Sequence, residues 1–481
     1  MSRVKVTVLS DASAPSLVLA VLPSFAAAAG VAAEDERKLA SVVEGLLAFA
    51  LEHGYPGEEL GEIEVTLEAG HDCVQVAVHD WGRPLMSRGG GFGPLPEGLA
   101  AIEAEARAVQ LLNLGRNGKR LTAEVPVRAG AAGEAAPHHV EAASGPAPAA
   151  AGAEDTIELR AGTPLDAEAI AQLLYENYHL SYVHEDFYRP RYLMAVLEMK
   201  QLLSTVAVHE GRVVGHHALM PLAGGACGET GAAVVHSAYR GLGIFGRMVD
   251  HTLEVARERG LASVFGDAVT IHPFSQRAEL SHGYREAALQ LAMVPGQTTM
   301  RALAGRGPGR RTATLRSYLA FDQQPRRIAL PAPYGELLED VYANLGLAAE
   351  PREETASSDG ELVTTEADEP RALGFLRLRR WDADGPSALR RALRHLLSLH
   401  VDVVYADVDL MAVDGDEATA ELNDLGFFAA GLILHGPDGH DHLRLQLLDS
   451  EQVELDDIVC DSPFADELRR RVLEDKARIG A

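Results

Sequence analysis

The chain has 481 residues, 47% of them hydrophobic, and its 70 acidic and 43 basic residues give a formal net charge of −27. This length and composition predict two to four globular domains, and the acidic excess argues against nucleic-acid binding as a main role. The three cysteines, Cys73, Cys227 and Cys460, follow no disulfide or metal-binding spacing. We therefore expect a cytoplasmic protein with no nucleic-acid partner.

An uncharged segment near the start, residues 12–33, superficially resembles a secretory signal or a membrane span because it follows Arg3 and Lys5. Two prolines within it, Pro15 and Pro23, disfavour a continuous apolar helix. We therefore predict no membrane partner and assign this run to a folded domain.

That first domain is predicted over residues 1–127. Apolar residues at helical spacing over 39–51 end at His53-Gly54-Tyr55, and strand patterns at 62–67 and 73–78 lead to Asp80-Trp81-Gly82-Arg83-Pro84. A glycine-rich stretch at 89–93 and a hairpin pattern at 116–125 follow. This series resembles the GHKL-type ATP-binding fold, an α/β sandwich shared by histidine kinases and anti-sigma-factor kinases.

The resemblance implies that Asp80 accepts a hydrogen bond from the adenine amino group, with Gly82 beside it, which makes ATP a second candidate cofactor. In the family, a Glu and an Asn four residues later hold magnesium on this helix. Counting from Glu44, the Asn position is Ala48, and counting back from His53 it is Phe49. Since neither can bind a metal, kinase chemistry is not expected. ATP binding without turnover and a surface for a regulatory protein partner both stay open.

Residues 128–154 are rich in Ala, Gly and Pro and are predicted to be a flexible linker. A central domain over 155–303 follows. It begins with a strand at 156–160, a helix around 169–174 and a hairpin over 204–220 that turns at Glu210-Gly211.

The most informative motif joins an apolar strand ending at Val235 to a helix pattern that starts near Phe245. Its central residues are Tyr239-Arg240-Gly241-Leu242-Gly243. Glycine allows the backbone to approach a ligand closely, and the unpaired N–H groups of a first helical turn attract phosphate oxygens. Taken alone, the turn is equally well explained by the need for backbone freedom.

A strand at 261–265 and a short helix ending at His282-Gly283-Tyr284 complete the series, and residues 155–290 resemble the GNAT acetyltransferase superfamily throughout. The resemblance implies an N-acetyltransferase that moves an acyl group, usually acetyl, from acetyl-CoA directly to an amine acceptor. The cofactor-binding residues that it implies are Val234, Val235, Tyr239, Arg240, Gly241, Leu242, Gly243, Ile244, Phe245 and Gly246. Phe245 departs from the small residue of the family pattern, so it either crowds the pyrophosphate or packs under the helix.

The chemistry requires a backbone N–H that polarises the thioester carbonyl, a proton acceptor and a thiolate acid. The strand around Val234 is the expected carbonyl donor. For the proton acceptor the candidates are His236, Glu279 and His272, and His216 and His217 stay open as alternatives. Glu279 occupies the position of the tyrosine that many family members use as the thiolate acid, so the acid is unassigned, and Ser281 or His282 could replace it only if their side chains face the thiol.

The last third, residues 313–450, alternates strands and helices and faintly resembles a second GNAT unit, with Leu425-Gly426-Phe427 echoing His282-Gly283-Tyr284. Residues 381–386 hold a single glycine where the phosphate turn should be. We therefore expect a degenerate unit that binds no coenzyme A and either walls the acceptor site or mediates dimerisation. A helical tail over 451–481 is predicted to end the chain.

Two clusters in this region were weighed as metal sites. Aspartates at 407, 409, 414 and 416 do not fit a calcium loop, because Met411 stands where an oxygen ligand is needed. His435, His440 and His442 flank a hairpin turn and could chelate a transition metal, but hairpin tips often carry histidine without one. No metal is therefore predicted.

The sequence as a whole predicts a multidomain α/β (α+β) protein with an ATPase-like domain, a GNAT fold and a degenerate GNAT-like unit. The expected function is acyl transfer to an amine, regulated by nucleotide or by a partner at the first domain. The alternative is a non-catalytic, anti-sigma-factor-like regulator that senses acetyl-CoA or ATP. Protein lysines, protein N-termini, polyamines and small amines all stay open as acceptors.

Overall fold

The computed structural model describes residues 2–55, 60–70, 72–85, 99, 102–127, 156–295, 311–352, 361–411, 415–449, 455 and 458–480. The predicted linker at 128–154 and the glycines at 89–93 lie outside these ranges. Contacts between Cα atoms divide the chain into two compact units. The first comprises Met1–Lys200, Val206–His216 and Val234–Leu242, and the second comprises Gln201–Thr205, His217–Ala233 and Gly243–Ala481. No helix in the described ranges is long and apolar enough to cross a membrane.

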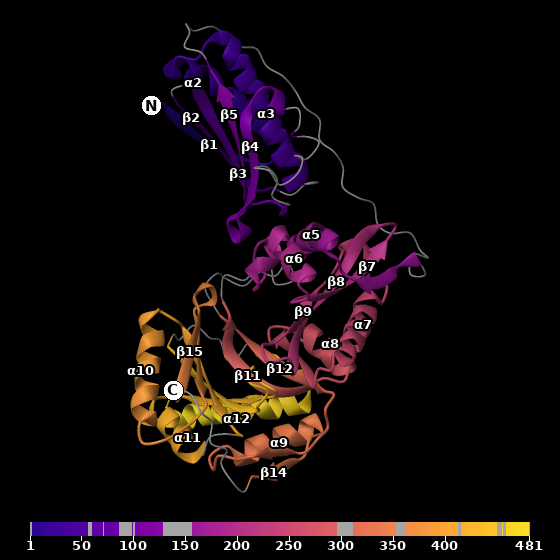
Figure 1. Cartoon of the computed structure of the whole chain (residues 1–481), viewed down its shortest axis with the longest axis vertical. Coiled ribbons are helices and arrows are strands. Elements are labelled where there is room, and N and C mark those ends of the chain that lie inside the picture. Colours follow the sequence, from indigo (N-terminus) through magenta and orange to yellow (C-terminus); the bar gives the residue numbers. More distant parts are fainter. Residues whose placement is uncertain are drawn as a thin grey trace. The chain divides into compact units, whose positions relative to one another are not determined.

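The N-terminal part of the first unit is an antiparallel sheet in the strand order β1-β2-β3-β5-β4. The strands are β1 (Arg3–Leu9), β2 (Glu62–Ala69), β3 (Cys73–Asp80), β4 (Arg107–Asn113) and β5 (Lys119–Pro126). The helices are α1 (Ala14–Leu19), α2 (Leu22–Ala29) and α3 (Ala33–Gly54). Residues alternate between buried and more exposed along β2 and β3, and α3 packs against β3 and β5 (Figure 1). The run at 12–33 therefore belongs to two short helices over this domain's core.

A second sheet has twelve strands in the order β15-β16-β17-β19-β18-β11-β12-β10-β9-β8-β7-β6. The first seven in chain order are β6 (Glu158–Ala161), β7 (Leu203–His209), β8 (Arg212–Pro221), β9 (Cys227–Val235), β10 (Ser263–Val269), β11 (Arg285–Val294) and β12 (Thr312–Ala320). The others are β15 (Val363–Asp368), β16 (Leu373–Leu378), β17 (Val403–Asp409), β18 (Phe428–Ile433) and β19 (His442–Leu448). A separate two-stranded sheet pairs β13 (Arg326–Ile328) with β14 (Ala349–Pro351).

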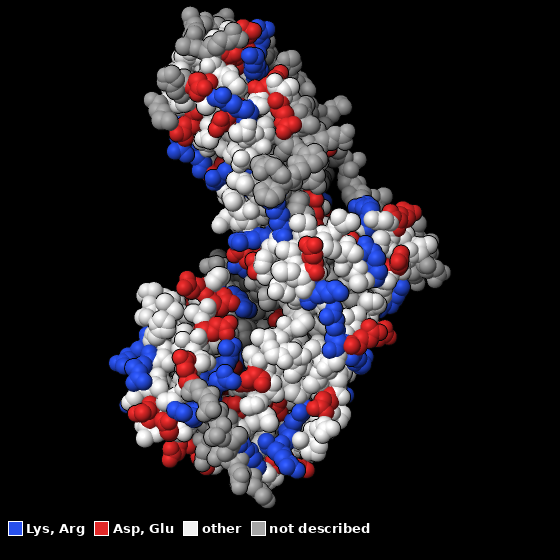
Figure 2. All heavy atoms as spheres, viewed as in Figure 1, with Lys and Arg blue, Asp and Glu red and all other residues white. Residues whose placement is uncertain are grey.

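The α-helices of the described chain after residue 155 come between strands of the second sheet in chain order, except α12, which follows the last strand. They are α5 (Ala167–Tyr178), α6 (Pro190–Glu198), α7 (Ile244–Glu258), α8 (Phe274–Ser281), α9 (Gly335–Leu345), α10 (Gly385–Ser398), α11 (Gly415–Asp424) and α12 (Pro463–Ile479). In the second unit, α9 and α12 both contact β11 and β18 (Figure 1). On the face drawn in Figure 2, Lys and Arg side chains lie interspersed with Asp and Glu.

Two parallel strand pairs of this sheet differ in the length over which their strands pair. The parallel strands β9 and β10 pair only from Cys227 to Glu229 and from Ser263 to Phe265. The parallel strands β16 and β17 pair along six residues each, over 373–378 and 403–408. The ladder between β9 and β10 therefore opens after three residues, whereas the ladder between β16 and β17 stays closed.

The predicted boundary after residue 303 falls between two strands that pair with each other. β12 follows that boundary, yet it runs antiparallel to both β11 and β10. The Gly- and Arg-rich segment over 304–310, outside the described residues, therefore connects two neighbouring strands of one sheet. The break in composition marks a connection, and the sheet continues across it.

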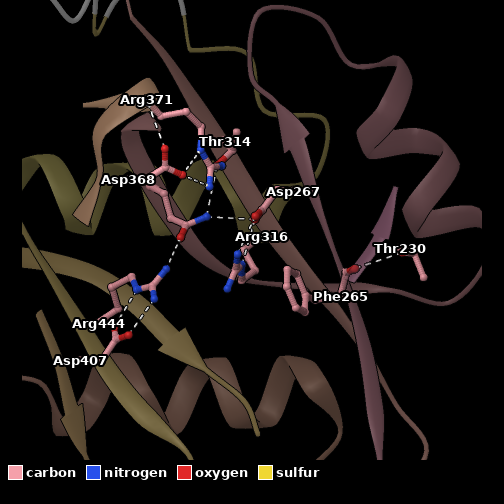
Figure 3. Close-up of polar contacts among 10 residues, drawn as sticks. Thr230, Phe265, Asp267, Thr314, Arg316, Asp368, Arg371, Asp407 and Arg444 are labelled. Carbon is pink, nitrogen blue, oxygen red and sulfur yellow. Dashed lines mark hydrogen bonds and ion pairs between the residues drawn. The ribbon is translucent and has the colours of Figure 1, made fainter. Parts of the chain in front are cut away.

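A buried polar network joins the strands in the middle of this sheet (Figure 3). Arg316 on β12 donates two hydrogen bonds to Asp267 on β10, at 2.9 and 2.6 Å. Arg444 on β19 donates two to Asp407 on β17, each at 2.7 Å. Gln290 on β11 connects the pairs, donating to Asp267 Oδ1 at 2.9 Å and accepting from Arg444 Nη1 at 2.5 Å.

The two ion pairs repeat one local arrangement. Each aspartate pairs in register with its arginine, and each guanidinium lies over an aromatic ring two residues before the aspartate, at 4.0 Å for Phe265 and 5.3 Å for Tyr405. Burial is the largest single influence and would raise the pKa of Asp267, but the charge and hydrogen bonds of Arg316, with the Arg444 charge and the Gln290 hydrogen bond, together leave that pKa lowered. The same balance, with Arg444, lowers the pKa of Asp407. The carboxylates therefore stay ionised inside the sheet.

β11 meets β18 at a close backbone contact, where Ala288 pairs with Gly431. Gly431 has a φ of 140°, and a Cβ added there would lie 2.2 Å from the carbonyl oxygen of Ala287. We expect Gly431→Ala to lower the free energy of unfolding by about 2–4 kcal/mol, because it adds both a steric clash and backbone strain. Chemical denaturation of the full chain measures this.

Gly346, at the C-terminal end of α9, is the matched control for that substitution. It also has a positive φ, 71°, but no heavy atom lies within 4 Å of its would-be Cβ. Gly346→Ala should therefore cost only about 1 kcal/mol. Equal losses in the two variants would contradict a tight β11–β18 contact.

Candidate functional site

The loop that follows β9 and begins α7 is the best-defined candidate site. Gly241 and Gly243 have φ values of 82° and 67°, and non-glycine residues rarely adopt such values. A Cβ added to either glycine would meet no heavy atom within 4 Å. The glycines are therefore required by the backbone path, and the space beside both of them is open.

This loop presents a row of backbone donors. The N–H groups of residues 241–246 donate to no acceptor among the described residues. The first turn of α7 also contains no acidic side chain. Free N–H groups at a helix start attract anionic oxygens, and the helix dipole adds to the attraction. The loop can therefore hold a phosphate or pyrophosphate group.

Arg240 adds the only side-chain charge within this row of residues, 240–246. Its Nη2 donates to Asn177 Oδ1 at 2.6 Å, and its Nε lies 3.4 Å from the Val235 carbonyl oxygen. The side chain is exposed, so its guanidinium keeps donors for a ligand. Asn177 could not be found from sequence patterns, because a polar residue in α5 has no fixed spacing from the loop.

Phe245 lies on the exposed side of the first turn of α7. Its residue is 37% exposed, and its ring centroid lies 6.4 Å from that of His217. The buried positions of this turn and the next belong to Ile244 and Met248, so the exposure of Phe245 does not favour the alternative in which its ring packs under the helix. Whether the exposed ring leaves room for the pyrophosphate stays a prediction.

His236 caps the short 3-10 helix Ser237–Tyr239. Its Nδ1 accepts a hydrogen bond from the Ala238 N–H at 3.2 Å, and its Nε2 lies 3.6 Å from Glu176. The lone pair of Nδ1 is therefore already used by the Ala238 N–H. This arrangement argues that His236 shapes the loop and weakens its case as the proton acceptor.

Tyr239 and the other candidate histidines also have structural partners. Tyr239 Oη lies 3.0 Å from Nδ1 of His209, and His217 Nδ1 lies 2.9 Å from the Thr252 hydroxyl. His216 is fully buried and its ring lies 5.9 Å from that of Phe187. These contacts fit packing roles for the histidines of β7 and β8.

Glu279 lies on α8 with its carboxyl group directed at β10. A Cβ added to Gly266 would lie 2.4 Å from Glu279 Oε1, and Oε2 is buried with no hydrogen-bond partner among the described residues. Burial raises the pKa of Glu279 well above its usual value, although the Ser317 hydroxyl opposes the shift. Glu279 is therefore a neutral carboxylic acid over a wider pH range than an exposed glutamate, as a general acid requires.

His272 follows β10 in the turn before α8. Its Nδ1 is buried and has no hydrogen-bond partner in the described chain, and its ring lies 5.2 Å from that of Phe274. His272 and Glu279 lie in the second unit and His236 in the first. The three catalytic candidates lie in different surroundings, and the role of each in catalysis stays a prediction.

The N-terminal sheet places Asp80 at the end of β3, fully buried. Oδ1 accepts from Gly82 N–H at 2.9 Å and from Lys119 Nζ at 2.5 Å. Oδ2 is buried with no hydrogen-bond partner among the described residues. This free acceptor fits the predicted bond from an adenine amino group, since a buried acceptor without a partner is costly.

Three glycines surround this carboxylate closely. A Cβ at Gly54 would lie 2.9 Å from Asp80 Oδ1, one at Gly82 would lie 2.4 Å from the Gly54 carbonyl oxygen, and one at Gly118 would lie 2.2 Å from the Asp80 carbonyl oxygen. On α3, Phe49 is buried against the core and its ring lies 4.3 Å from that of His53. Phe49, one of the two positions at which a magnesium ligand would stand, therefore serves packing.

The raised pKa of Glu279 makes stability depend on pH in a defined direction. The folded state holds this proton more tightly than the unfolded chain does. The contribution of Glu279 to stability is therefore fully present below its pKa in the unfolded chain, and it is lost as the pH rises toward its pKa in the folded state. We expect Glu279→Gln to remove this loss, which is up to about 1.4 kcal/mol per pH unit within that window. The difference in Tm between variant and native protein should grow from pH 5 to pH 8.

Glu258→Gln, at the exposed C-terminal end of α7, is the control for loss of one negative charge. It should leave the pH profile of Tm unchanged. A Glu279→Gln profile that runs parallel to the native one would show that this carboxyl group is ordinarily ionised.

Comparisons with known proteins agree with this description. A family model for the histidine kinase-like ATPase domain matches residues 9–97, and the model for the acetyltransferase (GNAT) family matches residues 167–277. The second match contains the whole loop over 236–243 and the first turn of α7. Among curated proteins, none matches the sequence.

Several solved acetyltransferases cover about a third of the chain. A putative acetyltransferase from Salmonella typhimurium, solved with acetyl-CoA, is 17% identical over 35% of this chain and 96% of its own, with a TM-score of 0.29. A ribosomal-protein-alanine N-acetyltransferase from Brucella melitensis is 21% identical over 34% and 99%, with a TM-score of 0.28. A ribosomal-protein-S5-alanine acetyltransferase from Vibrio fischeri is 16% identical over 35% and 94%, also at 0.28.

The chain is a mixed α/β protein. It carries a histidine kinase-like ATPase segment at its N-terminus and a GNAT acetyltransferase segment, which supports acyl transfer in general, in its centre.

Proposed function

We propose that the central segment transfers an acyl group, most simply acetyl, from acetyl-CoA to an amine acceptor. The observation that carries the proposal is the row of N–H groups over 241–246, which have no acceptor among the described residues. Such a row suits the pyrophosphate of coenzyme A, and Arg240 supplies a positive charge beside it. The family match over residues 167–277 supports the same cofactor.

The early end of pairing between β9 and β10 supports a binding site for the acyl-bearing arm of acetyl-CoA beside these strands. Because pairing stops at Glu229 and Phe265, the following residues of the two strands are not joined by a ladder. An N–H group of β9 near Val234 is then a candidate donor to the thioester carbonyl. In the proposed reaction the amine nitrogen attacks the carbonyl carbon, the C–S bond breaks, and the thiolate takes a proton.

Glu279 is our candidate for the group that supplies that proton. Its carboxyl group lies against Gly266 of β10, and its raised pKa keeps a proton available. His272, in the turn at the end of β10, is the remaining candidate for the proton acceptor. His236 is less suited, since its Nδ1 already accepts from Ala238.

The N-terminal segment is proposed to bind an adenine nucleotide without turning it over, and thereby to regulate transfer. The free Oδ2 atom of Asp80 favours adenine binding, whereas Ala48 and Phe49 leave no metal ligand at the position that magnesium would need. The rival proposal, a regulator that senses acetyl-CoA or ATP without catalysis, shares this binding site. It differs in predicting cofactor binding with no transfer to any amine.

Release of free thiol from acetyl-CoA, measured against a panel of amines with and without ATP, tests these proposals. We expect turnover with at least one amine in the native protein. Arg240→Glu should weaken acetyl-CoA binding about 10- to 100-fold, because it replaces a charge-assisted contact with repulsion. Gly243→Trp should abolish binding by filling the open space beside the loop.

Gly260→Trp is the matched control for the bulky substitution. Gly260 has a similar φ, 72°, and equally open surroundings, but it follows the other end of α7. It should bind acetyl-CoA like the native protein. Binding without turnover on any amine would favour the sensor, and native-like binding by Gly243→Trp would contradict this cofactor site.

A further inference from the structure

A cluster of three ionisable side chains lies where the β18–β19 hairpin meets the end of β17, far along the chain from the residues of the acyl-transfer site. Asp409 is the last residue of β17, His442 is the first of β19, and Asp438 lies in the turn between β18 and β19. One ligand atom from each, a histidine nitrogen or a carboxylate oxygen, lies within 4.8 Å of the others. Among the described residues this is the group whose geometry suits an ion.

Strand pairing holds two of the three side chains together. Asp409 and His442 are directly opposite each other in the antiparallel register of β17 and β19, so their side chains emerge on the same face of the sheet. Both residues are almost completely buried, at 2% and 1% exposure. Their positions are therefore fixed by the sheet.

The imidazole of His442 points into this cluster without an ordinary hydrogen bond. Neither ring nitrogen meets the geometry of a hydrogen bond with a described residue, although Nε2 and Asp438 Oδ2 lie 3.3 Å apart and form an ion pair when His442 is protonated. A Cβ added to Gly436 would lie 2.8 Å from Nδ1, so backbone closes that edge of the ring. Nε2 is therefore the nitrogen that can bind a ligand.

Neighbouring groups hold the carboxylates in place. The Met411 N–H donates to Asp409 Oδ1 at 2.7 Å, and Nδ1 of His440 lies 2.7 Å from Asp409 Oδ2. Asp438 Oδ1 accepts from the His440 N–H at 3.1 Å. Hydrogen bonds of this kind orient metal-binding carboxylates in known sites.

We propose that Asp409, Asp438 and His442 form a binding site for a divalent transition-metal ion such as Zn²⁺. One imidazole nitrogen and two carboxylates suit zinc and its neighbours better than magnesium or calcium, which prefer oxygen ligands alone. A dication also neutralises the two negative charges. The ion would fasten the hairpin turn to the end of β17, a structural role independent of the proposed acyl transfer.

Equilibrium dialysis of the full chain against buffered Zn²⁺ at pH 8, followed by metal analysis, tests the site. The native protein should hold one more Zn²⁺ per chain than His442→Gln. His395→Gln, which changes an exposed histidine of α10, should match the native protein. Equal metal content in His442→Gln and the native protein would overturn the proposal, and so would a native protein that holds no zinc.

Thermal unfolding keeps the proposal testable if His442→Gln does not fold. Zn²⁺ should raise the Tm of the native protein, because a ligand that binds the folded state stabilises it, and should leave that of Asp438→Asn unchanged. An unchanged native Tm would contradict the site. An equal rise with Mg²⁺ would contradict its assignment to a transition metal.

Discussion

The opening of the parallel ladder after Glu229 and Phe265 is the constraint on which the rest of the central segment depends. Pairing with β10 ends there, and β9 leads on to a loop whose N–H groups at 241–246 find no acceptor in the described chain. Two glycines with positive φ give that loop its path. The opened strands and the free donors together create the place that we assign to acetyl-CoA.

The other parallel pair of the second sheet, β16 and β17, has no such opening. β16 and β17 pair along their full common length, and α10 begins at Gly385, packed closely on Trp381. Yet the Asp407–Arg444 pair and its aromatic neighbour repeat the arrangement at Asp267 and Arg316. The two halves thus share a sheet design, and the closed ladder supports the proposal that the second half binds no coenzyme A.

Sequence reasoning succeeded where the pattern is local. The α9 helix, the hairpin turn at 436–439 and the glycine-containing turn between β9 and α7 follow from periodicity and glycine placement, and the two family resemblances agree with the matched models. Sequence reasoning failed where contacts between residues far apart in the chain determine the structure. The place of β12 between β10 and β11, the support of Arg240 by Asn177 and the link from Gln290 to Arg444 join distant residues, and no spacing encodes them.

The central claim is that the backbone of residues 241–246 binds the cofactor's pyrophosphate. Hydrogen exchange measured by mass spectrometry, with and without coenzyme A, tests it directly, since amides without an acceptor exchange rapidly and slow when a ligand accepts from them. We predict that coenzyme A slows exchange in peptides covering the loop and the first turn of α7. Bound coenzyme A that leaves this segment unchanged and slows another would contradict the account.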